Sequence, residues 1–318
     1  MALPEVEDRL LERLSLPQLS AETHLRALDV TVPEAMDDVA AIGVDTNILK
    51  ALRREPTFAD SLFVTVQSTE TTLIAPGQCV IEYWNNHKVF ASEDWNTFKN
   101  DLAKLTKHLD SDGVDGHDEE AVREIQRLVG DLTRDLEESR NPEYLKKSQA
   151  LMRQLLDSAT MPMVSRSRLA SLAEVRLASK TPPGWADDKS KSAALGDFFG
   201  WCDFLFGVLC AEDPRKRTKF LFVTDDTKPD WRTGAMGHPA LIAEFDWVCD
   251  GQLSIISLQD LRKLLAADAR TKPATVDAEA EESPQGGIGA GPASTSESEE
   301  STQSGTEAAP ASRTEAES

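Results

Sequence analysis

Short runs of apolar residues, separated by longer amphipathic or charged stretches, set the pattern of this chain. The run at residues 39–44 (Val-Ala-Ala-Ile-Gly-Val) and the run at residues 220–223 (Phe-Leu-Phe-Val) are wholly apolar. Such runs are typical of strands that are buried on both faces of a parallel sheet, because a strand with one exposed face alternates with polar residues. Two further strands are predicted at residues 72–75 and 254–258. The pattern therefore predicts an α/β fold.

Helical spacing fills most of the chain around these strands. Val6, Leu10 and Leu14 share one face of an N-terminal helix that Pro17 ends. Further helices are predicted over residues 46–54, 78–87, 193–210 and 238–248, and a closing helix contains Leu261, Leu264 and Leu265. Charged helical sequence also fills residues 93–179, which predicts three or four inserted helices and an acidic loop at residues 110–118.

These patterns divide the chain into three parts. Residues 1–38 form an N-terminal helical extension, and residues 39–265 form the main domain, with the helical insertion at about 93–179. Residues 266–318 carry eleven acidic and three basic residues and no aromatic residue. Such a segment buries too little apolar surface to offset the entropy lost on ordering, so a disordered acidic tail is predicted.

Charge and cysteine content narrow the function. The net charge is −21, which argues against sequence-blind adhesion to nucleic acid or to an anionic membrane. The four cysteines are scattered, without a Cys-x-x-Cys pair, and the N-terminus is acidic where a signal peptide is basic and then apolar. The longest apolar stretch, residues 198–210, is too short to span a bilayer and contains Asp203. The sequence predicts a cytoplasmic protein with no membrane segment.

Carboxylates follow the predicted strands. Asp45 comes directly after the first strand, and Asp225 and Asp226 come just after residues 220–223. Glu82 lies in the second turn of the helix after residues 72–75, and Asp197 begins the apolar helix that leads to the next strand. Each has a structural alternative: a helix N-cap for Asp45, a polar turn for the Asp-Asp pair, a solvated helix face for Glu82 and a favourable helix-end charge for Asp197.

Taken together, the acids favour a metal site. In open α/β sheets, ligands bind beyond the carboxyl ends of the strands, where these side chains would meet. Four acids around one crevice repel one another unless a cation lies between them. Oxygen ligands without His or Cys favour Mg²⁺ or Mn²⁺ over zinc. Such ions orient and activate water for phosphodiester cleavage.

Several blocks in this order also resemble the PIN superfamily, and more narrowly a bacterial PIN-like branch with a long helical insertion. The blocks are residues 44–49 (Val-Asp-Thr-Asn-Ile-Leu), 76–86 (Pro-Gly-Gln-Cys-Val-Ile-Glu-Tyr-Trp-Asn-Asn), 182–185 through 195–197, and 222–226 through 230–231. The resemblance covers roughly residues 39–265. The first 38 residues and the acidic tail lie outside it.

The resemblance implies a three-layer α/β/α fold around a parallel sheet and a Mg²⁺- or Mn²⁺-dependent endonuclease, with RNA favoured over DNA as the substrate. A metal-activated water, held by an acidic quartet, would cleave the phosphodiester bond. The positions that match the family are the quartet Asp45, Glu82, Asp197 and Asp226, the variable position Asp225, which assists at the metal, and the supporting residues Asn47 and Thr224.

Two other functions stay open. The first is a catalytically silent PIN-like module that binds or regulates, with a protein partner or a second copy of the chain. This alternative rests on the net charge of the folded part. The chain carries a net charge of −21 and residues 266–318 carry −8, which leaves −13 for residues 1–265. The candidate phosphate-binding cations are few: Arg53, Arg54, Lys88, Lys189, Lys191 and Arg215-Lys216-Arg217. The second is another phosphohydrolase, although Asp45-Thr46-Asn47 lacks the second Asp of the haloacid-dehalogenase-like signature.

Overall fold

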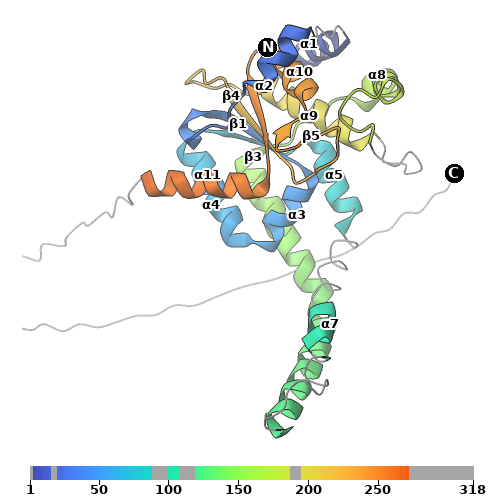
Figure 1. The fold of residues 1–318 in the computed structure, drawn as a ribbon, viewed down its shortest axis with the longest axis vertical. Helices are drawn as coiled ribbons and strands as arrows, with labels where there is room; N and C mark the ends of the chain where they lie inside the picture. Colours follow the sequence, from blue (N-terminus) through green and yellow to red (C-terminus); the bar gives the residue numbers. More distant parts are fainter. Residues whose placement is uncertain are drawn as a thin grey trace, which may run out of the picture. The chain divides into compact units, whose positions relative to one another are not determined.

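Five parallel strands form the centre of the computed structural model, which describes residues 3–15, 20–87, 99–105, 107, 119–186 and 195–271. The strands are β1 (Val39–Val44), β2 (Thr72–Ile74), β3 (Ala159–Thr160), β4 (Lys219–Val223) and β7 (Gln252–Ile256). Their order in the sheet is β3-β2-β1-β4-β7, and each neighbouring pair is parallel (Figure 1). The parallel α/β fold predicted from the apolar runs is confirmed.

β1 is the strand at which the sheet topology divides. It lies between β2 and β4, and Gly43 is opposite Ile74 on one side and Phe222 on the other. The chain leaves β1 for β2 on one side and later returns through β4 on the other. Such a switch point opens a crevice beyond the carboxyl ends of the two strands. Because Val44 and Val223 are in register, the residues that follow them meet there.

Helices cover both faces of the sheet (Figure 1). One face packs against α3 (Thr46–Arg54), α4 (Pro56–Ser68), α11 (Leu258–Thr271) and the end of α7 (Glu119–Ser158). The other face packs against α9 (Gly196–Cys210), α10 (Pro239–Cys249) and α1 (Leu3–Ser15). Side chains alternate along β4, so that Leu221 and Val223 join the first core while Phe222 joins the second. The result is the three-layer arrangement that the family resemblance implied.

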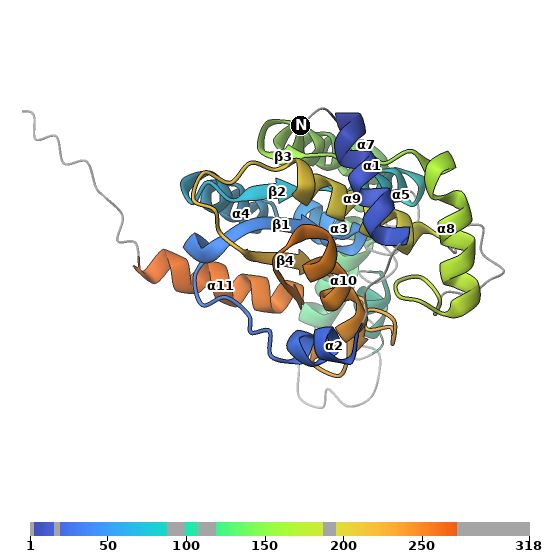
Figure 2. The ribbon, with the colours of Figure 1, turned by 90° about the horizontal axis from the view of Figure 1, so that it is seen from above.

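The N-terminal helices pack on the second layer. Val6, Leu10 and Leu14 are buried, which confirms the predicted apolar face of α1. Figure 2 shows α1 over α9 and α2 (Ala21–Leu28) beside α10, and both pairs are in contact. α8 (Arg166–Ser179) also contacts α9. A short hairpin, β5 (Arg232–Thr233) with β6 (Met236–Gly237), follows β4.

The predicted helical insertion is dominated by one long helix. α7 has 40 residues, and its C-terminal part is held in the core by Leu151 and Leu155. Ser148, which is fully buried, shares a hydrogen bond of 2.8 Å with the Tyr83 hydroxyl. The acidic loop predicted at residues 110–118 and the tail from residue 272 onward lie outside the described residues. α11 continues to Thr271, past the boundary that the sequence predicts at residue 265.

The same segment contributes a strand where the sequence predicts only helices. β3 follows α7 directly and extends the sheet, with Ala159 opposite Leu73 and Thr160 opposite Ile74. Two residues are too few to carry a periodic signal. Residues 159–160 are therefore recognised as a strand only through their pairing with β2.

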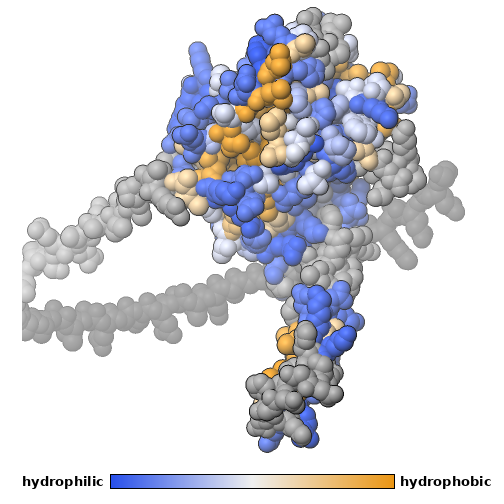
Figure 3. Space-filling model, viewed as in Figure 1, coloured by the Kyte–Doolittle hydropathy of each residue, from blue (hydrophilic) through white to orange (hydrophobic). Residues whose placement is uncertain are grey.

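Polar side chains dominate the face drawn in Figure 3, with apolar residues on the body and on α7. On α7, Ile125, Leu128 and Leu132 are each 41–52% exposed. None of the helices within the described ranges is both long and apolar enough to cross a membrane.

Candidate active site

Asp45 stands at the junction of β1 and α3, and it has two roles there. It is the N-cap residue of α3, and its Oδ1 accepts a hydrogen bond of 2.6 Å from the Thr46 N–H. The N-cap, which the sequence offered as a structural alternative for Asp45, is therefore present. The cap uses only one carboxylate oxygen, and the other is directed into the crevice between β1 and β4, where it has separate partners.

The second oxygen of Asp45 is fixed by the two predicted supporting residues. Asn47 Nδ2 donates to Asp45 Oδ2 at 2.6 Å, and Thr224 Oγ1 donates to the same oxygen at 2.7 Å. Thr224 Oγ1 also accepts from the N–H of Asp226 at 3.0 Å, and Asn47 Oδ1 accepts from the N–H of Asp225 at 3.2 Å. Asn47 and Thr224 thus tie the end of β1 to the end of β4.

Glu82 reaches the same region from α5 (Gly77–Asn85). Thr46 Oγ1 donates to Glu82 Oε2 at 3.0 Å, and Gln78 Nε2 donates to Oε1 at 3.0 Å. Thr46 therefore bridges Asp45 through its backbone N–H and Glu82 through its hydroxyl. Gly196, at the start of α9, approaches so closely that a Cβ added there would overlap Glu82 Oε1. The absence of a side chain at Gly196 is what lets α9 and Glu82 come together.

Asp197 and Asp226 meet at a lysine that the sequence interpretation missed. Lys228 Nζ lies 3.2 Å from Asp197 Oδ2 and 2.9 Å from Asp226 Oδ2. Trp231 Nε1 also donates to Asp197 Oδ2, at 3.1 Å. Asp197 is in the first turn of α9 and Asp226 follows β4, so the lysine joins two elements. The string Asp-Asp-Thr-Lys-Pro-Asp places Lys228 two residues after Asp226, but it gives no sign that the lysine also reaches Asp197.

Asp225 faces a different element from its neighbour. Its Oδ1 accepts a hydrogen bond of 2.9 Å from the N–H of Leu258, the first residue of α11, and the residue is exposed. Asp226 is half-buried and bonds within its own turn, where its Oδ1 accepts from the Lys228 N–H at 2.8 Å. The geometry thus separates the adjacent acids, and it directs Asp225 to the start of a helix.

The environment of Asp45 shows that the acids act on one another. Burial, together with the charges of Glu82 and Asp226, raises the pKa of Asp45 to about 6, against the lowering effect of the hydrogen bonds from Thr224 and Thr46. Negative charges raise the pKa of a neighbouring acid in this way when no positive charge close by offsets them. Asp45, Glu82 and Asp226 are therefore brought near one another by three separate elements.

Cys79 lies beside this group as a neutral side chain. Its Sγ is 3.8 Å from Asp45 Oδ1. Burial, with the charges of Asp45 and Glu82, raises the pKa of the Cys79 thiol well above its usual range. A thiol that stays protonated is a weak hydrogen-bond donor and not a metal ligand. The donor atoms offered by the site are therefore carboxylate oxygens.

These donors suit a divalent cation of the Mg²⁺ type. Carboxylate oxygens are hard ligands, and unbalanced negative charge around Asp45 would be relieved by a cation. In the described part of the chain, however, no three His, Cys, Asp or Glu side chains are gathered closely enough to hold one metal ion. Lys228 already occupies the space between Asp197 and Asp226. The chemistry of the carboxylates suits such an ion, but side-chain movement would be needed for more than two of them to hold it together.

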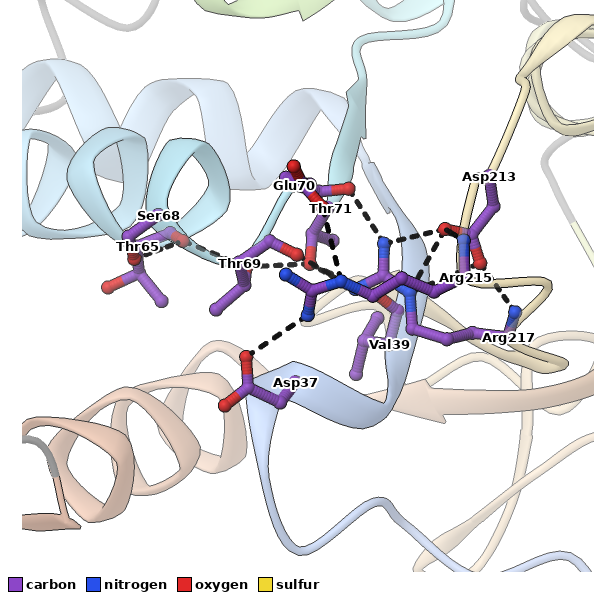
Figure 4. Close-up of polar contacts among 10 residues, drawn as sticks. All are labelled: Asp37, Val39, Thr65, Ser68, Thr69, Glu70, Thr71, Asp213, Arg215 and Arg217. Atoms are coloured by element: carbon purple, nitrogen blue, oxygen red, sulfur yellow. Dashed lines mark hydrogen bonds and ion pairs between the residues drawn. The ribbon is translucent and has the colours of Figure 1, made fainter.

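Two of the predicted phosphate-binding cations lie away from the site. Arg215 and Arg217 precede β4, at the opposite end of the strand from Asp226, and they are held by acids (Figure 4). Arg217 pairs with Asp213 at 3.0 Å, and Arg215 Nε lies 3.1 Å from Glu70 Oε2. Arg53 is only 5% exposed. Lys88, Lys189 and Lys191 lie outside the described residues.

A buried aspartate fixes the helices that carry Glu82 and Asp197. Asp203, on α9, is fully buried and accepts hydrogen bonds of 2.8 Å from the N–H groups of Gln78 and Val164. Its two oxygens also bind the guanidinium of Arg166 at 2.8 and 2.7 Å. Asp203 thus links α9 to the start of α5. Its position within an otherwise apolar helix was the sequence signal for this role.

A second buried aspartate holds the segment that leads toward α9. Asp230 is fully buried, and its Oδ2 accepts from the N–H groups of Gly184 and Ala186 at 2.8 and 3.0 Å. The prolines at 182 and 183, which precede this turn, are joined by a cis peptide bond. Asp230 therefore connects the Pro-Pro-Gly-Trp block to the turn after β4.

The comparison with known protein families gives one match. The family described as a PIN like domain matches residues 41–242, which is more than half of the chain. No curated protein and no solved structure matches. The matched range contains Asp45, Glu82, Asp197 and Asp226. With the central parallel sheet and its flanking helices, the match means that the chain belongs to the PIN-like domain family.

Proposed function

We propose that this protein is a Mg²⁺- or Mn²⁺-dependent endonuclease that cleaves RNA in preference to DNA. The observation that carries the proposal is the convergence of three acids: Thr46 donates to Asp45 and to Glu82 at 2.6 and 3.0 Å, and Thr224 bonds both Asp45 and the N–H of Asp226. Acids from three elements are placed within electrostatic reach of one another at the switch point of the sheet. Membership of the PIN-like family supports nuclease chemistry at this position.

Asp45, Glu82, Asp197 and Asp226 are the proposed metal ligands and catalytic residues. A divalent cation held there would polarise the phosphate and help to form the attacking nucleophile from water. Asp225 is left in an assisting role, because its carboxylate is engaged with the N–H of Leu258.

The other residues of the site orient these carboxylates. Asn47 and Thr224 both donate to one oxygen of Asp45, which fixes the orientation of the carboxylate. Thr46 holds Glu82 through its hydroxyl. Preorganised ligands of this kind lower the reorganisation that accompanies metal and phosphate binding.

The test compares Asp45→Asn with Asp38→Asn in full-length protein. Asp38 ends a short 3-10 helix just before β1 and pairs with Lys219, so it lies at the other end of the same strand. End-labelled single-stranded RNA and DNA of one sequence are incubated with Mn²⁺, with Mg²⁺ or with a chelator. We expect metal-dependent cleavage of RNA that Asp45→Asn lowers by at least about 100-fold and that Asp38→Asn leaves unchanged.

Three results contradict parts of this proposal. Cleavage that survives in Asp45→Asn contradicts the proposed active site. Cleavage of DNA faster than RNA contradicts the proposed preference for RNA. Tight binding of nucleic acid or of a protein partner, with neither cleavage nor metal binding, favours the silent module. The net charge of −13 for residues 1–265 and the acid-paired Arg215 and Arg217 are the observations behind that alternative.

A further inference from the structure

The four acids of the proposed site fall into two pairs with different partners. Asp197 and Asp226 share the ammonium group of Lys228, at 3.2 and 2.9 Å. Asp45 and Glu82 share Thr46, which contributes a backbone N–H and a hydroxyl. One pair is thus bridged by a charged group, and the other is bridged by neutral ones.

The neutral partners of the second pair leave its charge unbalanced. Within the described residues, the hydrogen-bond donors to Asp45 are Thr46, Asn47, Thr224 and the thiol of Cys79, and the donors to Glu82 are Thr46 and Gln78. None of these groups carries a charge.

Lys228 occupies the place that a bridging cation would take between the first pair. Mg²⁺ binds carboxylate oxygens at about 2.0–2.1 Å. An ion at that distance from both Asp197 Oδ2 and Asp226 Oδ2 would overlap the ammonium, which already contacts the same two atoms. It would also meet the repulsion of a like charge at very short range.

The turn after β4 holds Lys228 in place. Its N–H donates to Asp226 Oδ1 at 2.8 Å, and its carbonyl accepts from the N–H groups of Trp231 and Arg232, each at 3.0 Å. The Trp231 ring stacks on Phe222 of β4, with centroids 5.1 Å apart and planes 1° apart. The same ring donates through Nε1 to Asp197. The lysine is therefore part of a packed turn.

We propose that Lys228 takes the place of a second metal ion, so that the site binds one divalent cation, on the side of Asp45 and Glu82. This inference rests on the proposed metal-dependent function and narrows its ligand set, because Asp197 and Asp226 then bind the ammonium group of Lys228 in place of a metal ion. Lys228 then acts as a positioning residue, which holds Asp197 and Asp226 and limits the number of metal ions. The lysine side chain remains 36% exposed, so it also places one positive charge at the opening of the site.

The experiment counts Mn²⁺ ions bound to metal-free, full-length protein by isothermal titration and by electron paramagnetic resonance. The variants are Lys228→Met, which keeps the length of the side chain without its charge, and Lys228→Arg, which keeps the charge. The matched control is Lys219→Met, because Lys219 begins β4 and pairs with Asp38 at the opposite end of the strand. The tail is the same in every protein, so weak binding to its acids cancels in the comparison.

We expect one tight Mn²⁺ per chain in wild type, Lys219→Met and Lys228→Arg, and two in Lys228→Met. The second ion should bind at least about 100-fold more tightly in Lys228→Met than any second ion binds in wild type, because a close positive charge has been removed. In chelator, Lys228→Met should unfold at a lower temperature than Lys219→Met, and Mn²⁺ should reverse the difference.

Two tight ions in wild type overturn the inference, whatever the variants do, and so does a count of one in both wild type and a folded Lys228→Met. These results leave the metal-dependent function standing. No tight Mn²⁺ in any of the four proteins, together with no cleavage, removes the proposed function itself. The two failures are thus distinguishable.

Discussion

Replacing Asp45 by asparagine should change the pH dependence of stability in metal-free protein. In the wild type, the carboxylate is half-buried and lies near the charges of Glu82 and Asp226, which together raise its pKa from 3.8 to about 6. The substitution keeps the size of the side chain and removes the charge. It therefore isolates the free energy of holding an ionised Asp45 among other acids.

The magnitude follows from the pKa difference between the unfolded and folded states. A change from 3.8 to about 6 is about 2 units, and each unit corresponds to about 1.4 kcal/mol, so the ionised group costs about 3 kcal/mol of stability. The amide that Asp45→Asn introduces cannot accept the bonds from Asn47 and Thr224 in the same way, and each lost bond costs about 1 kcal/mol. The net gain of the variant at high pH is thus about 1 kcal/mol.

The sign reverses at low pH. Below about pH 4 the carboxyl group is protonated in both states, so the wild type bears no charge penalty and the variant shows only its lost hydrogen bonds. As the pH rises from about 4 to about 6, the unfolded state ionises before the folded state, and wild-type stability falls relative to the variant. Above about pH 6 the difference stays constant.

Urea unfolding in chelator, followed by circular dichroism at several pH values, measures this difference. Asp45→Asn should be less stable than the wild type near pH 4 and more stable near pH 8. Asp38→Asn serves as the control, because Asp38 is exposed and pairs with Lys219. A stability difference between Asp45→Asn and wild type that does not change between these pH values refutes the reasoning. Mn²⁺ should stabilise only the protein that retains Asp45.

Two further substitutions test how the site is assembled. In Gly196→Ala, the new Cβ displaces Glu82. Mn²⁺ affinity measured by titration should therefore fall about 10-fold, while the free energy of unfolding changes by less than about 1 kcal/mol. The control is Gly130→Ala, where nothing lies within 4 Å of an added Cβ, and it should leave the affinity unchanged. Asp203→Ala leaves two backbone N–H groups and Arg166 without their buried acceptor, and chemical denaturation should show a loss of about 3 kcal/mol; a loss below about 1 kcal/mol would mean that Asp203 does not secure α5 to α9.

Local interactions explain why much of the fold could be predicted. Continuous apolar runs identified β1 and β4 because burial on both faces needs no tertiary detail to be recognised. The helix over residues 46–54 was predicted, and Asp45 could be named as its alternative N-cap because a cap is a contact between neighbouring residues. β3 was missed because two residues show no period, and its strand character comes from pairing with β2.

What the sequence alone determined about the site was the set of acids at the strand ends and their place on a parallel sheet. Local order fixed these features, because residues that follow parallel strands must meet at one edge. The tertiary structure decided how the acids are partnered, through contacts between residues 31 to 179 positions apart. It turned Asp225 toward α11, set Lys228 between Asp197 and Asp226, and left Asp45 and Glu82 with neutral donors. Such choices depend on packing in three dimensions, which no spacing along the chain encodes.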